Sequence, residues 1–370
     1  MEKKAFFVMV IGPHDHVDEQ KNNFWEEEVL LNSLGYKIIK KFFQHRVNID
    51  SSTYIGSGKL QEIKNEALIE KPDLIYLNDV LNPAIIFRVE QSFWEVDENI
   101  NVWDRVDLIL NIFQKHATSV EAKLQIELAR LKHLGPRIYG LGRQLSQQYG
   151  AIGVRGGFGE TLLEKMKRYI KLRIRAIENR LQQIEEKKNY QIKQRKEKKL
   201  FTISLVGYTN TGKTTLFNLL TKKEKLVADQ PFSTLETVTG KIRKLNSSIL
   251  VSDTIGFIEN LPLFLIDAFK TTLMETASAD LIFHLIDSSD KNWLNKLSSV
   301  NSILDQLKID ENKVILVLNK IDKVRENDLL IAKRQFSDKI FFISAKTGEG
   351  VNRLISFINE YFSNNYSFNN

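Results

Sequence analysis

Residues 207–214 read Gly207-Tyr208-Thr209-Asn210-Thr211-Gly212-Lys213-Thr214, and this stretch decides the fold of the C-terminal half of the chain. It fits the phosphate-binding loop G-x-x-x-x-G-K-S/T, in which backbone N–H groups and a helix N-terminus face phosphate oxygens. An apolar run at 200–206 precedes it as a strand would, and a helix-forming stretch at 215–221 follows. This context predicts a nucleotide site in which Lys213 reaches the β- and γ-phosphates, Thr214 ligates Mg²⁺ and Thr215 completes the contacts.

Three further polar groups follow along the chain in an order that supports this interpretation. They are Asp253-Thr254-Ile255-Gly256, Asn319-Lys320-Ile321-Asp322 and Ser344-Ala345-Lys346, and each comes after an apolar run. In an open parallel α/β sheet, ligands bind at the carboxyl ends of the strands. We therefore expect all three groups to converge on the edge of the sheet where the phosphate-binding loop lies.

The second of these groups indicates which base is bound. The Asp322 carboxylate can accept hydrogen bonds from guanine N1–H and the 2-amino group, both of which adenine lacks, so ATP would leave it unpaired. Lys320 would cover one face of the base, and backbone N–H groups of 344–346 would contact its O6 edge. Alone, Asn-Lys-x-Asp is equally explained as a turn after a strand. In order with the other two groups, it predicts a GTP site.

A magnesium ion is expected beside the phosphates. Asp253 would hold Mg²⁺ through water, because Mg²⁺ keeps most of its hydration, and the Gly256 backbone would approach the γ-phosphate. A second switch segment is expected at 230–239, where Thr234 is the candidate for the second Mg²⁺ ligand and Thr237 and Thr239 are alternatives. The nucleotide contacts predicted in this segment are Phe232, Ser233, Thr234, Leu235 and Glu236.

Hydrolysis requires a water molecule in line with the γ-phosphate and neutralisation of the developing charge. Lys213, Thr234 and Gly256 are the residues expected to act there. In many GTPases a glutamine follows Asp-x-x-Gly, but this chain has Phe257 at that position, which neither donates nor accepts a hydrogen bond. We therefore expect slow intrinsic hydrolysis that is completed by a partner or by a monovalent cation.

Composition excludes several classes of protein and isolates one basic segment. The chain has no cysteine, which excludes disulfides and thiol chemistry and predicts a cytoplasmic location. No apolar run reaches the roughly 18 residues that span a bilayer. The net charge is +7, but residues 161–200 hold 14 Lys/Arg against 5 Asp/Glu, so the rest of the chain carries −2. This segment is a footprint for a polyanion, which we favour, or a solvated helix face.

The expected fold class is α/β, with two regions before the nucleotide domain. Residues 1–115 alternate strands and helices, which predicts a small parallel sheet with crossover helices. Within them, Gly56-Ser57-Gly58-Lys59 has the wrong spacing for a second phosphate-binding loop and is interpreted as the start of a helix. A P-loop nucleotide domain is expected at 200–362, followed by a polar tail at 363–370.

Residues 116–199 have a helical pattern instead of an alternating one. Apolar residues recur every three or four positions over 120–131 and 163–184, and no Gly or Pro interrupts 160–199, which predicts a helix of about 40 residues. Two long helices joined by a loop should form a long antiparallel hairpin with basic residues on its outer face. The glycine-rich loop, about 135–160, carries Arg143 and Arg155 and either approaches RNA closely or is a linker.

Taken together, these features resemble the HflX family of ribosome-associated GTPases over nearly the whole chain. The resemblance rests on Thr53-Tyr54-Ile55-Gly56-x-Gly58-Lys59, Lys123-Leu124-Gln125-x-Glu127-Leu128-Ala129 and Arg155-Gly156-x-x-Gly159-Glu160. The phosphate-binding loop Gly207-Tyr208-Thr209-Asn210-x-Gly212-Lys213 and the switch Phe232-x-Thr234-Leu235 are more specific. The chain departs from the family where Gly157-Phe158 replaces a Pro-Gly step and where Thr211 and Thr214 replace Ala and Ser. The short C-terminal domain of many members is not expected here.

The resemblance implies binding to the large ribosomal subunit and the splitting of stalled or idle ribosomes under stress. The hairpin and its loop would approach the peptidyl-transferase region of ribosomal RNA. The resemblance also links the N-terminal part to ATP binding, but it assigns no residue of this chain to that role. Asn210 is similar to the loop asparagine of potassium-activated GTPases and is a candidate K⁺ ligand. We expect a monomer without a DNA partner. The alternatives are a ribosome-assembly GTPase and an RNA-binding switch protein with little turnover.

Overall fold

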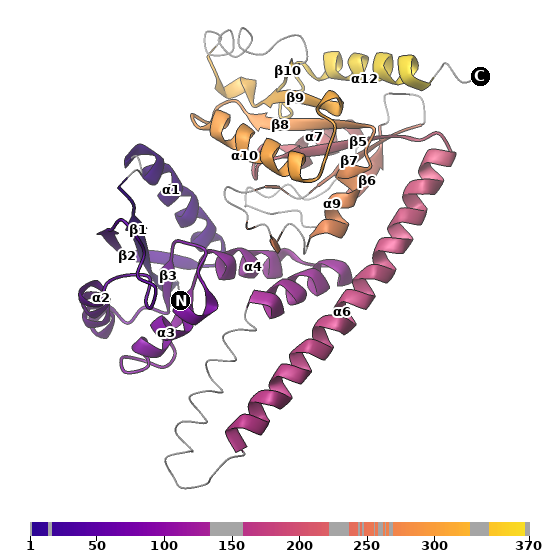
Figure 1. The fold of residues 1–370 in the computed structure, drawn as a ribbon. Helices are drawn as coiled ribbons and strands as arrows, with labels where there is room; N and C mark the ends of the chain where they lie inside the picture. The colour runs from indigo at the N-terminus through magenta and orange to yellow at the C-terminus, as the bar shows by residue number, and fades with distance from the viewer. Residues whose placement is uncertain are drawn as a thin grey trace. The chain divides into compact units, whose positions relative to one another are not determined.

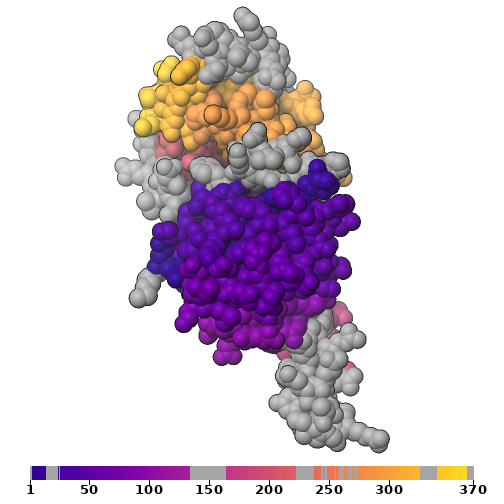
Figure 2. All heavy atoms as spheres, turned by 90° about the vertical axis from the view of Figure 1, so that its left-hand side faces the viewer, coloured from indigo at the N-terminus to yellow at the C-terminus, as the bar shows by residue number. Residues whose placement is uncertain are grey.

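The computed structural model divides the chain into two compact units, which are described separately (Figure 1). The first comprises Met1–Lys115 and Lys123–Arg180, and the second comprises His116–Ala122 and Leu181–Asn370. The structure describes residues 2–13, 17–133, 158–221, 237–242, 245, 248–254, 256–257, 262, 264–265, 269–325 and 340–366. In Figure 2, the N-terminal residues drawn from indigo to purple form one continuous surface.

The N-terminal unit contains a parallel sheet of order β2-β1-β3-β4. Its strands are β1 Lys3–Ile11, β2 Tyr36–His45, β3 Leu74–Leu77 and β4 Asn101–Trp103, and its helices are α1 Val17–Ser33, α2 Ser57–Glu70, α3 Pro83–Phe93 and α4 Arg105–His116. This arrangement confirms the predicted parallel sheet with crossover helices. The sequence prediction missed β4, because a strand of three residues with one fully buried side chain, Val102, has no readable periodicity.

The Gly56-Ser57-Gly58-Lys59 segment begins a helix, as predicted. Gly56 is the N-cap of α2, and its N–H group donates to the Gln44 side chain at 2.9 Å. The preceding Tyr54 and Ile55 are buried in the hydrophobic core beneath this turn. The segment therefore anchors α2 to the sheet through buried side chains and a cap.

Two antiparallel helices connect the sheets, as the sequence predicted. One helix covers residues 120–133, and the other is α6 Phe158–Glu197, which is 40 residues long. In the second unit Glu121 pairs with Lys188 at 2.7 Å, whereas in the first unit Glu127 pairs with Arg173 at 2.6 Å, so the helices run in opposite directions.

The buried and exposed faces of these helices follow the predicted pattern only in part. Ile170, Ile177 and Leu181 of α6 are buried, but Val120, which the periodicity placed on the apolar face, is 65% exposed. Leu128 of the predicted apolar face is buried, together with Ala122, Gln125, Ile126 and Ala129, which the periodicity did not indicate. Of the 14 basic residues in 161–200, all except Lys188 and Arg195 are exposed, which agrees with the predicted basic outer face.

The second unit contains a sheet of order β10-β9-β8-β5-β7-β6, in which only β6 is antiparallel among the described strands. The strands are β5 Phe201–Gly207, β6 Val238–Lys241, β7 Ile249–Asp253, β8 Leu281–Asp287, β9 Val314–Asn319 and β10 Ile340–Phe342. The helices are α7 Lys213–Thr221, α9 Lys270–Ala277, α10 Trp293–Gln306 and α12 Val351–Tyr366, with 3₁₀ turns η1 Glu311–Lys313 and η2 Ile321–Lys323. Helix α12 thus extends four residues beyond Phe362, the predicted end of the nucleotide domain.

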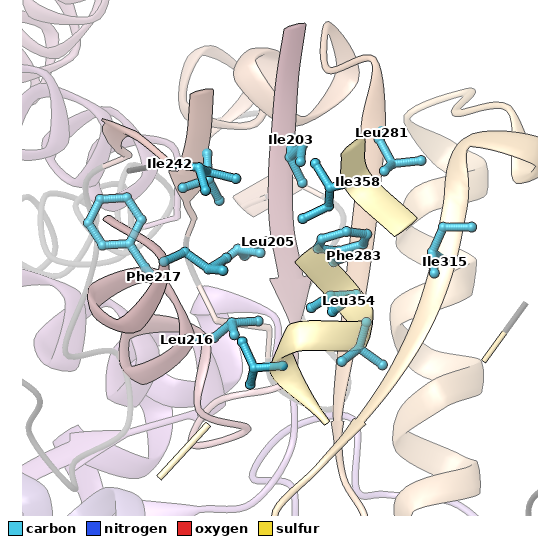
Figure 3. Close-up of a cluster of buried hydrophobic side chains, with 14 of the residues drawn as sticks. Ile203, Leu205, Leu216, Phe217, Ile242, Leu281, Phe283, Ile315, Leu354 and Ile358 are labelled. Atoms are coloured by element: carbon cyan, nitrogen blue, oxygen red, sulfur yellow. The ribbon is translucent and has the colours of Figure 1, made fainter. Parts of the chain in front are cut away.

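Alternation along β5 distributes helices over both faces of this sheet. Ile203 and Leu205 lie in one buried cluster with Leu216 of α7 and with Leu354 and Ile358 of α12 (Figure 3). Val206 points the other way, into a cluster with Leu273 of α9 and Val300 of α10. Because successive side chains of a strand face opposite sides, β5 is buried on both faces and is fixed at the centre of the sheet.

Candidate nucleotide-binding site

The phosphate-binding loop lies between the end of β5 and the start of α7, as predicted. Gly207 has a φ of +146° and Gly212 a φ of +91°, a region that side chains strongly disfavour. A Cβ atom at Gly212 would lie 2.3 Å from Nδ2 of Asn319. The glycine therefore allows the loop to approach the strand that carries the predicted base contacts.

The side chains predicted for phosphate and magnesium lie together at this turn. The buried Lys213 ammonium donates to the carbonyl oxygens of Gly207 at 3.0 Å and Tyr208 at 2.7 Å. Beside it, Thr214 Oγ1 donates to Asp253 Oδ2 at 3.0 Å, and Asp253 is fully buried at the end of β7. Hydroxyl and carboxylate oxygens are the ligands that Mg²⁺ accepts, so this pair fits the predicted ion.

Asn319 joins the phosphate-binding loop to the third polar group. Its Nδ2 donates to the Thr211 carbonyl at 2.7 Å, and its Oδ1 accepts from the Ala345 N–H at 2.8 Å. Asn319 is 2% exposed, so its amide is committed to holding these two loops together. Three of the four predicted groups therefore meet around one buried side chain.

Asp322 lies in the 3₁₀ turn η2 after Asn319 and remains exposed. A hydrogen bond from the Ser344 side chain and the charges of Lys346 and Lys323 hold the pKa of Asp322 below its ordinary value. The carboxylate is thus ionised and oriented at neutral pH, as an acceptor for two N–H groups requires. The N–H group of Ile321, the residue before Asp322, donates to the carbonyl of Ile343 at 3.3 Å. This bond holds the turn against the end of β10.

Phe257 takes part in the fold of the loop and lies away from solvent. It is 2% exposed, its N–H donates to the Gly207 carbonyl at 3.1 Å, and its carbonyl accepts from Thr209 N–H at 2.8 Å. Thr254 also turns inward, because its hydroxyl donates to the Leu205 carbonyl at 2.6 Å. Gly256 lies between them, and a Cβ there would approach Lys213 Nζ to 3.1 Å.

Part of the predicted site lies outside the described residues. These positions are Phe232, Ser233, Thr234, Leu235, Glu236 and Ile255. Among the alternatives to Thr234, Thr239 lies in β6 opposite Ser252, and its hydroxyl donates to Glu275 at 3.3 Å. The Thr239 hydroxyl is therefore bonded to Glu275 and not to the Thr214–Asp253 pair. Thr234 stays the predicted second magnesium ligand.

The loop at the end of β8 carries ion pairs that were not predicted from the sequence. Asp287 Oδ2 lies 2.7 Å from Lys320 Nζ, and Asp287 Oδ1 accepts from Ser289 N–H at 3.0 Å. The same loop carries Asp290, which pairs with Lys296 at 2.5 Å, and Lys296 lies 4.5 Å from the ring centre of Tyr208. The signal was present, because Asp287-Ser288-Ser289-Asp290 follows an apolar run just as the other three polar groups do.

Family models match the three regions of the chain. Residues 21–114 match the N-terminal region of GTP-binding GTPases, and residues 116–195 match their middle region. Residues 202–320 match a family described as 50S ribosome-binding GTPases. Across the described residues, no helix is both long and apolar enough to cross a bilayer.

Individual relatives extend this similarity over most of the chain. GTPase HflX of Caldanaerobacter subterraneus is 38% identical over 358 residues, covering 96% of this chain and 80% of the relative. GTPase HflX of Escherichia coli is 34% identical over 348 residues, covering 94% and 80%. A solved structure of SsGBP in complex with GDP is 27% identical, with a TM-score of 0.52, and covers 98% of this chain and 99% of that one.

Proposed function

The chain belongs to the HflX family of GTPases, and we propose that it binds the large ribosomal subunit and separates stalled or idle ribosomes. GTP hydrolysis is the activity of this family. The observation that carries the nucleotide part of the proposal is the convergence of Lys213, the Thr214–Asp253 pair and Asn319 on one turn. A site built this way binds a triphosphate through the loop and a magnesium ion through oxygen ligands.

We assign the roles in hydrolysis from the position of each group. Lys213 would exchange its two carbonyl acceptors for the β- and γ-phosphate oxygens, and the Gly256 N–H would face the γ-phosphate. Magnesium supplies charge neutralisation when bound, held by Thr214 directly, by Asp253 through water and by Thr234. Asp322, Lys320 and the 344–346 loop would select guanine.

The proposed site contains no side chain that can orient the attacking water at the position after Gly256. Phe257 is buried and hydrogen bonded only through its backbone, so it contributes packing. A ribosomal partner or a monovalent cation is proposed to complete catalysis. Asn210 is exposed with a φ of +61°, so its side chain is free to meet K⁺ beside the phosphates. Equal ribosome-stimulated rates in K⁺ and Na⁺ would exclude the cation.

The charge of α6 supports a ribosomal RNA partner. Its exposed lysines and arginines are distributed along a helix of 40 residues, which rises 1.5 Å per residue. Polyanion binding through such side chains depends steeply on salt, because each neutralised phosphate releases counterions. The similarity of residues 202–320 to 50S ribosome-binding GTPases points to the large subunit as the source of that RNA.

The first experiment measures GTP hydrolysis in potassium buffer, alone and with purified large subunits, and follows binding by sedimentation. We expect strong stimulation, and co-sedimentation with a non-hydrolysable GTP analogue. Lys213→Ala should abolish both hydrolysis and nucleotide-dependent binding, whereas Lys291→Ala, an exposed lysine of the same unit, should change neither. Full ribosome splitting by Lys213→Ala would favour an RNA-binding switch. Preference for precursor particles over mature subunits would favour an assembly GTPase.

A further inference from the structure

Helix α6 is joined to the nucleotide site by a very short connection. Its end is closed by Lys199, with a φ of +52°, and by the Leu200 N–H, which donates to the Arg195 carbonyl at 2.9 Å. Strand β5 begins at Phe201 and runs directly into the phosphate-binding loop. The last turn of α6 is therefore held at the base of the strand that positions the phosphates.

A single carboxylate connects this last turn to two other elements. Glu275, on α9, accepts a hydrogen bond from Thr239 Oγ1 at Oε2, 3.3 Å away, and its Oε1 lies 3.6 Å from Arg195 Nη2. The Glu275 side chain is 11% exposed, so solvent screens these contacts only weakly. The three residues line a cavity of about 10 Å³, which has room for about one water molecule.

Strand β6 and helix α9, which carry Thr239 and Glu275, lie on either side of Asp253 and Gly256 in the sequence. Thr239 is in β6, which continues from the predicted switch segment, and it lies opposite Ser252, the residue before Asp253. Helix α9 follows the segment that begins with Asp253 and Gly256. Movement of either segment on exchange of GTP for GDP would change the spacing that lets Glu275 reach both partners.

We propose that Glu275 is a positioning residue that couples the nucleotide state to the last turn of α6 through Thr239 and Arg195. A nucleotide shifts such an equilibrium only by its different interactions with the two states, and the Thr239–Glu275–Arg195 contacts would transmit that difference to α6. The coupling fixes how firmly the basic helix is held against the sheet when GTP is bound. The consequence for ribosome binding rests on the function proposed above, whereas the coupling itself does not.

The coupling is tested first without ribosomes, by hydrogen exchange of the amides of 192–200 in the full-length protein. The protein is loaded with GDP or with a non-hydrolysable GTP analogue. We expect about 10-fold slower exchange in the GTP-like state, a typical size for coupling between two sites. Glu275→Gln and Arg195→Gln should each abolish this difference while leaving GTP affinity and Tm nearly unchanged. Glu197→Gln, an exposed carboxylate of the same turn, is the matched control and should keep it.

Two results would overturn the coupling. One is equal exchange of 192–200 with both nucleotides in the unmodified protein, and the other is a nucleotide-dependent difference that survives in both Glu275→Gln and Arg195→Gln. Hydrolysis measurements provide a readout that a purely structural role would not move. Basal kcat and KM should stay unchanged in Glu275→Gln, whereas kcat stimulated by large subunits should fall about 10-fold. Absence of stimulation in the unmodified protein would reject the ribosomal partner and leave the exchange result standing.

Discussion

Both sheets of this protein have polar residues near the carboxyl ends of their strands. In the N-terminal unit these residues pair with one another inside the protein, whereas in the GTPase unit they surround the phosphate-binding loop. In the N-terminal unit, the buried Glu27 carboxylate of α1 pairs with Arg105, which follows β4, and accepts a hydrogen bond from the Tyr76 hydroxyl of β3 at 2.6 Å. At the carboxyl ends of the strands of the GTPase sheet, Lys213 and Asn319 instead donate hydrogen bonds to backbone carbonyl groups of the phosphate-binding loop.

The difference shows that position at the carboxyl edge of a parallel sheet does not by itself make a site. In the N-terminal unit the charges neutralise each other inside the protein, and burial raises the pKa of Tyr76 well above its ordinary range. In the GTPase unit, Asp322 is exposed and already ionised. The first arrangement stabilises the fold, and the second leaves charge available for a nucleotide.

The largest expected effect comes from breaking the internal ion pair. Glu27→Ala leaves the Arg105 guanidinium, which is 8% exposed, without its carboxylate and should destabilise the N-terminal unit by about 3–5 kcal/mol. Urea denaturation measures this. Glu28→Ala, at the next position of α1, should cost less than about 1 kcal/mol. A loss in Glu27→Ala no larger than in that control would mean that the pair is solvated in solution.

The second prediction concerns a buried histidine close to the nucleotide site. The pKa of His284 is lowered to about 4, chiefly by burial and to a smaller extent by the Lys213 charge, against an opposing hydrogen bond with Asn301. The unfolded chain binds the proton more tightly, with a pKa near 6.5, so stability present above pH 6.5 is lost as the pH falls toward 4. The loss should total about 3 kcal/mol. The free energy of unfolding, measured by denaturation between pH 7 and 4, should fall less steeply with pH for His284→Asn than for the unmodified protein. An identical pH dependence would contradict this account.

The third prediction tests the exposed carboxylate of the GTPase edge. Asp322→Asn removes an acceptor for guanine N1–H and should weaken GTP binding about 100-fold, because a site built around a hydrogen bond rejects a mismatched group strongly. Xanthine nucleotides, which carry an oxygen in place of the 2-amino group, should bind the variant better than GTP does. Titration with fluorescent nucleotides measures both affinities. Unchanged preference for guanine would place base recognition elsewhere.

The smallest expected effect is at the overlooked loop after β8. Asp287→Asn removes the ion pair between Asp287 and Lys320. Both side chains are about one-fifth exposed, so the pair is partly solvated and GTP affinity should fall about 5-fold at most. Asp305→Asn, an exposed residue of α10, is the control and should bind GTP normally. A loss as large as that of Asp322→Asn would give Asp287 a direct part in base recognition.

Sequence reasoning succeeded where the signal was local. The strand–loop–helix around Lys213 and the strand ends at Asp253 and Asn319 were predicted because each motif is bounded by an apolar run. It failed where contacts with residues distant in the sequence decide which side chains are buried. Val120 has helical periodicity but faces solvent, because the packing of its helix against its neighbours favours the Ala122 face.

The interior polar contacts were also beyond the sequence. The residues of the Glu27–Arg105 pair are separated by most of the N-terminal unit, and no short motif connects them. Glu275 lies in a helix of eight residues with no notable pattern, and its role emerges only from the hydrogen bond to Thr239 across the sheet edge. Such contacts depend on topology and therefore require the folded chain.

The direct connection between α6 and β5 has a mechanical consequence. The part of α6 in the second unit, residues 181–197, is a stiff rod of about 25 Å at 1.5 Å per residue, and a tilt of about 5° at its last turn would displace Leu181 by about 2 Å. Only three residues, 198–200, separate that rod from the strand leading to the phosphates. This part of the helix thus has the geometry of a lever arm, which converts a change smaller than a bond length at its pivot into one several times larger at Leu181.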